Sequence, residues 1–168
     1  MANPDTPFGL RPYQKILRIR KFVSGGTTDV FKGDVVAMKS DGKVDVLTTT
    51  SGANSTLGVA ANFKDASAGD TELWVYDHPD QTFVIQDDGA AATPAQTNAG
   101  NTAPLILTTG NTTTGLSKHE LDISAAATGT ADPLKIVDFV AGPGLSIGKN
   151  ARIVVTLNRH LYKDRVSV

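Results

Sequence analysis

The chain has 168 residues, enough for one domain with a substantial core. Its net charge is −1 and 20% of its residues are charged, which excludes the strongly basic surface of a nucleic-acid-binding protein. Cysteine is absent, which excludes disulfides and thiolate metal sites. No apolar run is long enough to span a membrane, and the start lacks the features of a signal peptide. We therefore expect synthesis in the cytoplasm and no membrane partner.

Residues 1–12, M-A-N-P-D-T-P-F-G-L-R-P, have the period of neither a helix nor a strand. Proline fixes φ and pushes the preceding residue toward extended geometry, so the segment should be an extended, stiff arm. Such an arm either lies on its own domain or reaches a partner, and we predict the second. Pro4, Pro7 and Pro12 would hold Phe8 and Leu10 outward as the partner-binding anchors.

The next segments favour strands. Residues 13–23 alternate, with Leu17 and Ile19 on one side and Arg18 and Arg20 on the other, which predicts a half-buried strand. Residues 33–47 predict a hairpin. Its first strand contains the wholly apolar run 35–38, and an Asp-Gly turn follows.

Further strands are expected at residues 57–61, 72–76, 82–86, 105–107, 120–123, 134–140 and 151–157. Residues 77–80 read as a corner, because Pro79 cannot donate to a sheet. Residues 89–104 leave room for no more than a helical turn near 90–92. Residues 158–168 would form a last edge strand or a C-terminal arm.

About ten strands and no convincing helix predict an all-β protein. Only Glu72 and Glu120 are glutamates among 17 acidic residues, and aspartate favours turns over helices. A jelly-roll-like sandwich and a small β-barrel remain the two architectures, each carrying the extended N-terminal arm. Residues 13–168 would form a single β domain.

One group of residues could support chemistry. His78 lies near Asp77, Asp80, Asp87 and Asp88 in sequence, a set that could bind a hard cation or act as acid and base. The preferred interpretation is that these are turn residues at strand ends. We therefore predict no catalytic residue, no metal and no cofactor.

Two aromatic residues, Trp74 and Tyr76, lie on one face of a predicted strand. They could stack on a sugar or a base, but core or subunit interface is the more common role of such a pair. We predict them as interface aromatics. The basic stripe of Arg18, Arg20 and Lys21 reads as a solvated face or a set of salt-bridge partners.

Several patches resemble a known family. They are the N-terminal arm, L-G-V-A-A at 57–61, W-V-Y-D-H-P-D-Q at 74–81, F-V-I-Q-D-D-G at 83–89, P-L-K-I at 133–136 and N-A-R-I-V-V at 150–155. Together they resemble small structural proteins encoded beside the capsid genes of tailed bacteriophages. G-D-V-V at 33–36 is similar to a wider set of phage decoration proteins.

The resemblance implies a capsid decoration, or cement, protein on the outside of the virion. Its partners would be the major capsid protein and further copies of itself in a homo-oligomer, a trimer or a dimer. The resemblance implies no enzymatic activity. Two other hypotheses remain: another virion component, such as a head-fibre, tail or glycan-binding module, and a small β-sandwich hydrolase that uses the acids of residues 77–88.

Overall fold

The structure is a computed structural model that describes residues 3–48, 56–90, 92–129 and 131–163. Its regular structure is almost entirely β, which confirms the all-β prediction. The strands are β1 (Arg11–Pro12), β2 (Arg20–Ser24), β3 (Val35–Met38), β4 (Val44–Val46), β5 (Gly58–Ala60), β6 (Thr71–Tyr76), β7 (Thr82–Gln86), β8 (Thr102–Ala103), β9 (Leu105–Ile106), β10 (Glu120–Leu121), β11 (Leu134–Phe139) and β12 (Arg152–Leu157). Two 3₁₀ turns, η1 (Ala66–Ala68) and η2 (Gln96–Asn98), lie between them.

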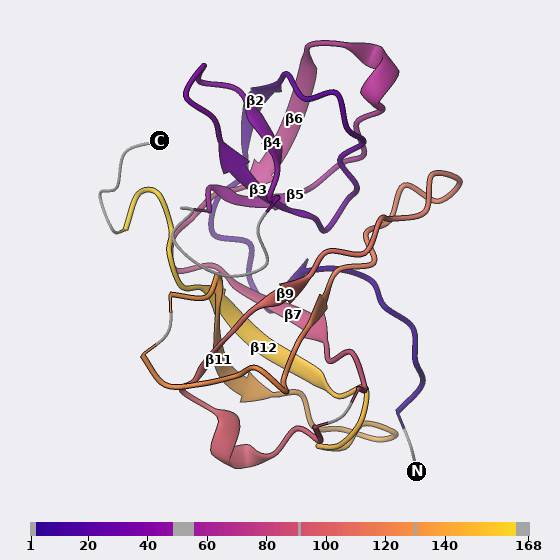
Figure 1. Ribbon diagram of the computed structural model, residues 1–168, viewed down its shortest axis with the longest axis vertical. Helices are drawn as coiled ribbons and strands as arrows, with labels where there is room; N and C mark the ends of the chain where they lie inside the picture. The colour runs from indigo at the N-terminus through magenta and orange to yellow at the C-terminus, as the bar shows by residue number, and fades with distance from the viewer. Residues whose placement is uncertain (1–2, 49–55, 91, 130, 164–168) are drawn as a thin grey trace.

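One lobe is a small closed barrel with strand order β2-β4-β3-β5-β6, at the top of Figure 1. The predicted hairpin at 33–47 forms β3 and β4, with Gly42 in the turn at a φ of 76°. The barrel interior is filled by small and medium apolar side chains: Val30, Val36, Val44, Leu57, Ala60, Leu73 and Val75. A barrel of five strands is narrow enough for such side chains to fill.

The second lobe is an antiparallel sheet with strand order β1-β7-β12-β11-β8, joined by the separate β9–β10 pair. Its main apolar cluster includes Phe83, Ile85 and Ile153. Val35 of β3 and Val59 of β5 belong to the same cluster. The barrel and the sheet therefore share one apolar core, and β3 is buried on both faces at Val35 and Val36, as its apolar run predicted.

The N-terminal segment lies on its own domain, so the prediction of a free arm is wrong. Phe8 is 8% exposed and Leu10 is 1% exposed. The guanidinium groups of Arg11 and Arg152 lie 4.6 and 5.7 Å from the centre of the Phe8 ring. Pro12 pairs with β7 as part of β1, at the edge of the sheet. Figure 1 shows the segment running along the sheet lobe.

Hydrogen bonds distant in sequence hold this segment in place. The Asn3 side chain donates to the backbone oxygens of Ser146 and Lys149, each at 2.9 Å. The Gln86 amide donates to the oxygen of Pro4 at 2.7 Å and accepts from the Thr6 N–H at 3.1 Å. The prolines keep the segment extended, as expected, but Gln86 and the 146–149 loop supply partners that a local pattern does not reveal. Pro4 is exposed and Pro7 is partly buried.

The strand predicted at residues 13–23 is also corrected. Regular pairing begins only at Arg20, and the alternation is reversed: Leu17 and Ile19 are exposed, while Arg18 and Arg20 turn toward a buried carboxylate. The physical reason lies in Asp77, directly after β6. Leaving this buried carboxylate without a cationic partner would cost more free energy than leaving two aliphatic side chains partly exposed.

The remaining differences are small. The 3₁₀ turn of the 89–104 region lies at η2 instead of at 90–92, where Ala91 falls outside the described residues. Residues 158–163 form one bridge, from His160 to Thr56, and no strand; residues 164–168 are not described. In the described part of the chain, no helix is long and apolar enough to cross a membrane.

Replacement of Leu10 by alanine tests whether the N-terminal segment belongs to the core. Because Leu10 is fully buried, L10A should lower the free energy of unfolding by about 3 kcal/mol. Leu17→Ala is the matched control, since Leu17 is 44% exposed, and it should change stability by less than about 0.5 kcal/mol. Urea denaturation measures both. Equal stabilities for L10A and the parent would mean that the segment is not packed in solution.

Candidate functional site

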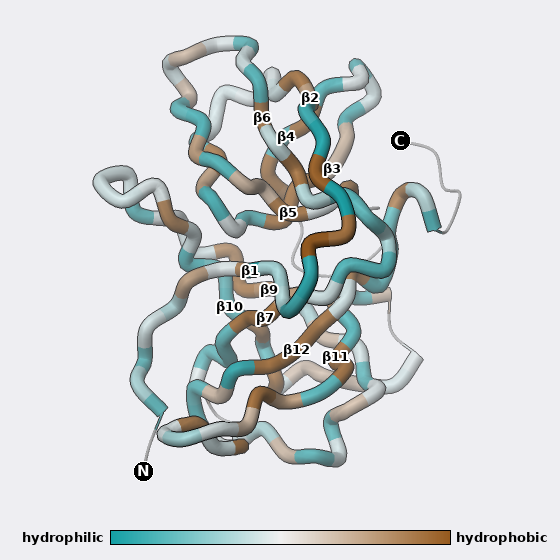
Figure 2. Tube along the Cα trace, turned by 180° about the vertical axis from the view of Figure 1, so that it is seen from behind, coloured by the Kyte–Doolittle hydropathy of each residue, from teal (hydrophilic) through white to brown (hydrophobic). Residues whose placement is uncertain are grey.

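The connection between β1 and β2 places three large aliphatic side chains on the surface. Ile16 is 49% exposed, Leu17 44% and Ile19 40%, and none of residues 13–19 belongs to a strand. Figure 2 shows this connection in the foreground between the two lobes, with a hydrophobic stretch flanked by hydrophilic ones. Scattered single apolar residues on a surface are ordinary, and three within four positions make this segment our candidate for a contact surface. We call residues 16–19 the exposed aliphatic segment.

A buried carboxylate sets the direction of this segment. Asp77 is fully buried, and its Oδ1 accepts from Arg18 Nε at 2.9 Å. Its Oδ2 accepts from Arg20 Nε at 2.5 Å and also pairs with Arg20 Nη2. Arg18 Nη2 donates to the backbone oxygen of Asp77 at 2.9 Å. Leu17 and Ile19, the chain neighbours of these arginines, keep their side chains exposed.

A buried glutamine fixes the backbone of the same segment. Gln81 is 1% exposed; its Oε1 accepts from the Leu17 N–H at 2.8 Å and its Nε2 donates to the Lys15 oxygen at 3.1 Å. The Gln81 side chain therefore binds the peptide groups on both sides of Ile16. The exposed aliphatic segment is preorganised although it has no regular secondary structure.

A groove of about 470 Å³ adjoins this segment at the junction of the lobes. It is lined by Leu10, Arg11, Pro12, Gln14, Ile16, Lys32, Ala60, Tyr76 and Leu116. Three predicted site residues thus meet in one place: Leu10, Pro12 and Tyr76. Among the lining residues the charged side chains, Arg11 and Lys32, are both cationic. The groove suits an apolar segment that carries negative charge.

The two predicted interface aromatics do not form a common platform. Trp74 is 40% exposed on the barrel exterior, and Lys21 Nζ lies 5.4 Å from its ring centre. Tyr76 is partly buried, packs against the main apolar cluster and lines the groove. A sugar stacked on the ring face that Lys21 covers would have to displace Lys21, which also pairs with Glu72 at 2.7 Å.

The group of acids suggested for chemistry is divided by the structure. Asp77 pairs with the two arginines, and His78 Nδ1 accepts from the Asp80 N–H at 3.1 Å within the corner at 77–80. Among residues 3–48, 56–90, 92–129 and 131–163, no group of three or more His, Asp or Glu side chains is arranged to hold a metal ion. The corner interpretation fits these contacts.

Asp87 instead lies near a different set of acids. Burial raises the pKa of Asp87 to about 6, although the N–H groups of Gly89 and Asn150 oppose the shift. Burial also raises the pKa of Glu120 to about 7, helped by the charges of Asp5, Asp88 and Asp87. These acids come from the residues directly after β7, from β10 and from the N-terminal segment, a grouping that sequence spacing does not reveal.

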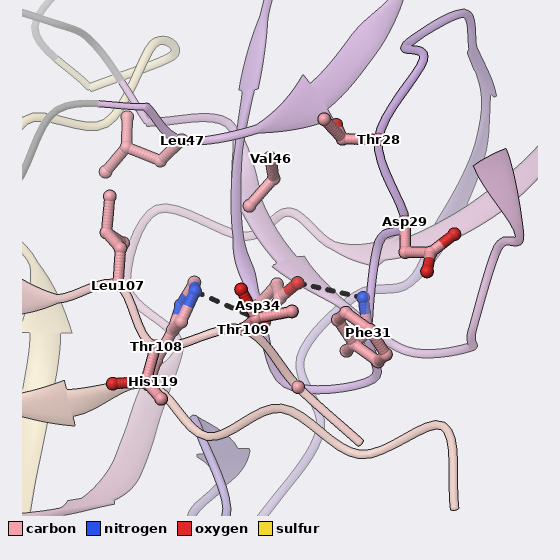
Figure 3. Close-up of a pocket in the computed structure, with 11 residues that line it drawn as sticks. Thr28, Asp29, Phe31, Asp34, Val46, Leu47, Leu107, Thr108, Thr109 and His119 are labelled. Carbon is pink, nitrogen blue, oxygen red and sulfur yellow. Dashed lines mark hydrogen bonds and ion pairs between the residues drawn. The ribbon is translucent and has the colours of Figure 1, made fainter. Parts of the chain in front are cut away.

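Sequence reasoning also missed a buried pair that lines a pocket between the barrel and the 107–119 hairpin. Asp34 is 2% exposed and His119 is 3% exposed, and Figure 3 shows their side chains pointing toward each other. Asp34 Oδ1 lies 3.3 Å from His119 Nε2, and its Oδ2 accepts from the Phe31 N–H at 2.8 Å. The two residues are 85 positions apart, and a lone histidine gives no spacing signal.

Comparison with known proteins adds no relative: no protein-family model, curated protein or solved structure matches the chain. What the site can do rests on its own geometry. That geometry is a preorganised apolar surface with a cationic rim.

The raised pKa of Glu120 predicts a pH-dependent gain in stability for Glu120→Gln. The folded protein holds this proton more tightly than the unfolded chain, so the associated stability is present below pH 4.5 and is lost as pH rises through about 7. E120Q removes the cost of the buried charge. The E120Q substitution should raise the melting temperature at pH 8 by roughly 2–4 °C. This corresponds to a gain of about 1 kcal/mol in the free energy of unfolding, because the group is partly screened by solvent. The gain should shrink toward pH 5.

Glu72→Gln is the matched control, because Glu72 is the other glutamate of the sequence and pairs with Lys21 on the surface. Thermal melts of E72Q should show no gain at pH 8. A gain for E120Q that is equal at pH 5 and pH 8 would contradict the assignment.

Proposed function

We propose that the chain is a structural virion protein that binds the outside of an assembled phage capsid and stabilises it. The observation that carries the proposal is the exposed aliphatic segment at residues 16–19, held rigidly beside a groove with a cationic rim. The resemblance of the N-terminal segment and of residues 74–89 to phage decoration proteins supports the same assignment. The partner would be the major capsid protein.

Preorganisation favours such contacts. The side chains of Gln81 and Asp77 already fix the segment, so docking would immobilise little backbone that was free before. Burying the exposed halves of three aliphatic side chains gives a modest affinity at each site. Arg11 and Lys32 beside them would favour an acidic patch on the shell subunit.

Multivalency would turn these modest contacts into stable decoration. A shell presents the same site many times, and a homo-oligomer, a trimer or a dimer, would engage several sites at once. The oligomer would then leave the shell only when several weak contacts are broken at the same time. No cofactor or catalytic group enters this account.

A glycan-binding virion module is the second candidate, because Trp74 is exposed on the barrel. Its ring face is partly covered by Lys21, which makes it a weaker platform. Quenching or a blue shift of Trp74 fluorescence on addition of glycans would favour this candidate over shell binding.

The double substitution Ile16→Asp with Ile19→Asp tests the proposed contact. Two carboxylates on the exposed aliphatic segment should weaken binding to purified phage heads at least about tenfold, since apolar burial is lost and charge must be desolvated. Co-sedimentation of the protein with heads that lack it measures the binding. The fold should remain stable, because both side chains are already solvent-exposed.

Ile147→Asp is the matched control. Ile147 is 42% exposed, in the loop between β11 and β12 at the end of the sheet lobe away from the barrel. I147D should bind heads as the parent does. Full binding by the double variant, or an equal loss in I147D, would reject residues 16–19 as the contact.

A further inference from the structure

The groove at the junction of the two lobes has the size and the apolar lining of a ligand site. Its volume of about 470 Å³ lies within the range of about 300–1,000 Å³ that is usual for binding pockets. Leu10 and Ala60 in its lining are each 1% exposed, and Leu116 and Tyr76 are partly buried beside them. An occupant must therefore bring an apolar group to make use of this lining.

Backbone hydrogen bonds hold the segments around the groove together. The Leu10 N–H donates to the Gly33 oxygen at 2.9 Å, and the Gly33 N–H donates to the Ala60 oxygen at 2.8 Å. The Lys32 N–H donates to the Gly115 oxygen at 2.9 Å. Four segments that are distant in sequence are thereby fixed relative to one another, so the groove exists before any partner arrives. A preformed site loses little conformational entropy on binding.

The same bonds disfavour recognition by strand addition. A partner strand needs unpaired backbone N–H and C=O groups along an edge. The N–H groups of Leu10 and Lys32 are already paired, the Lys32 oxygen accepts from the Ser117 N–H at 3.0 Å, and Pro12 has no N–H. We therefore expect the groove to recognise the side chains of its occupant.

Two exposed cations line the groove without an acidic partner. Within the described part of the chain, neither Arg11 nor Lys32 forms an ion pair, and no aspartate or glutamate is among the lining residues. The Arg11 guanidinium lies over the Phe8 ring, 4.6 Å from its centre. Contact with a ring face leaves the N–H groups at the guanidinium edge free to bind a carboxylate. Charge complementarity therefore calls for acidic groups beside the apolar one.

We infer that the groove takes up a segment of the shell subunit in which a large aliphatic side chain is flanked by acidic residues. The aliphatic side chain packs against Leu10, Ala60 and Leu116, and the carboxylates pair with Arg11 and Lys32. The identity of the partner rests on the proposed function, whereas the chemistry of the segment rests on the groove itself.

Titration with three model peptides, followed by ¹H–¹⁵N NMR, tests the chemistry of the groove. Acetyl-Glu-Leu-Glu amide should give saturable shifts at Gln14, Tyr76 and Leu116, with a dissociation constant in the millimolar range expected of a small ligand. Acetyl-Lys-Leu-Lys amide has the opposite charge, and acetyl-Glu-Gly-Glu amide lacks the aliphatic side chain. Each of these two peptides should bind at least about fivefold more weakly.

Lys32→Glu is the test variant, because the charge of an exposed side chain can be reversed without disturbing the core. K32E should weaken binding of the acidic peptide at least about tenfold, and it should weaken co-sedimentation with phage heads as well. Lys135→Glu is the matched control, since Lys135 is an exposed residue of β11 that does not line the groove. K135E should bind the peptide and the heads as the parent does.

The peptide and head measurements separate this inference from the proposed function. Absence of saturation by the acidic peptide, equal binding of the three peptides, or full peptide binding by K32E would overturn the inference, while head binding through residues 16–19 would stand. Loss of peptide binding in K32E with unchanged head binding would overturn the shell subunit as the source of the segment. Failure of the parent to sediment with heads would reject the proposed function and with it the shell subunit as partner.

Discussion

The fully buried carboxylate of Asp77 is the constraint on which the surface of this protein depends. A buried charge is tolerated only when it is paired and hydrogen-bonded, and Arg18 and Arg20 supply both. Their pairing anchors Arg18 and Arg20 on the inner side of this connection. Ile16, Leu17 and Ile19 are left partly exposed, and Gln81 binds the peptide groups on both sides of Ile16. A buried charge inside the protein thereby helps to hold the exposed aliphatic segment in place.

The N-terminal segment completes the fold. It closes the edge of the sheet at β1, buries Phe8 and Leu10, and forms one wall of the groove. Two stretches that are distant in sequence are in direct contact here, because Gln86 holds the backbone at Pro4 and Thr6. The surface proposed to meet the shell lies immediately after this segment in the chain.

The local residue pattern was sufficient to predict much of the fold, but it was insufficient to predict the candidate site. The apolar run of β3 and the Asp-Gly turn followed from short-range rules, since β3 and β4 pair across that turn. The strand β7 at Thr82–Gln86 followed from its own residue pattern, although its partners β1 and β12 are distant in sequence. The direction of residues 16–19 did not follow, because it depends on a carboxylate about 60 residues away. The pairing of Asp34 with His119 was hidden for the same reason. Of the predicted site residues, Leu10, Pro12 and Tyr76 meet at the groove, and Trp74 does not line it.

Hydrogen exchange with mass spectrometry, performed on the free protein and on protein bound to phage heads, tests the central claim most directly. The account predicts that the amides of Thr6 and Leu10 in the N-terminal segment are already protected in the free protein, because each donates a hydrogen bond to a residue distant in sequence. Binding should add protection chiefly at residues 13–23. Rapid exchange of these two amides in the free protein, followed by protection only on the head, would contradict the account and restore the N-terminal segment as the docking arm.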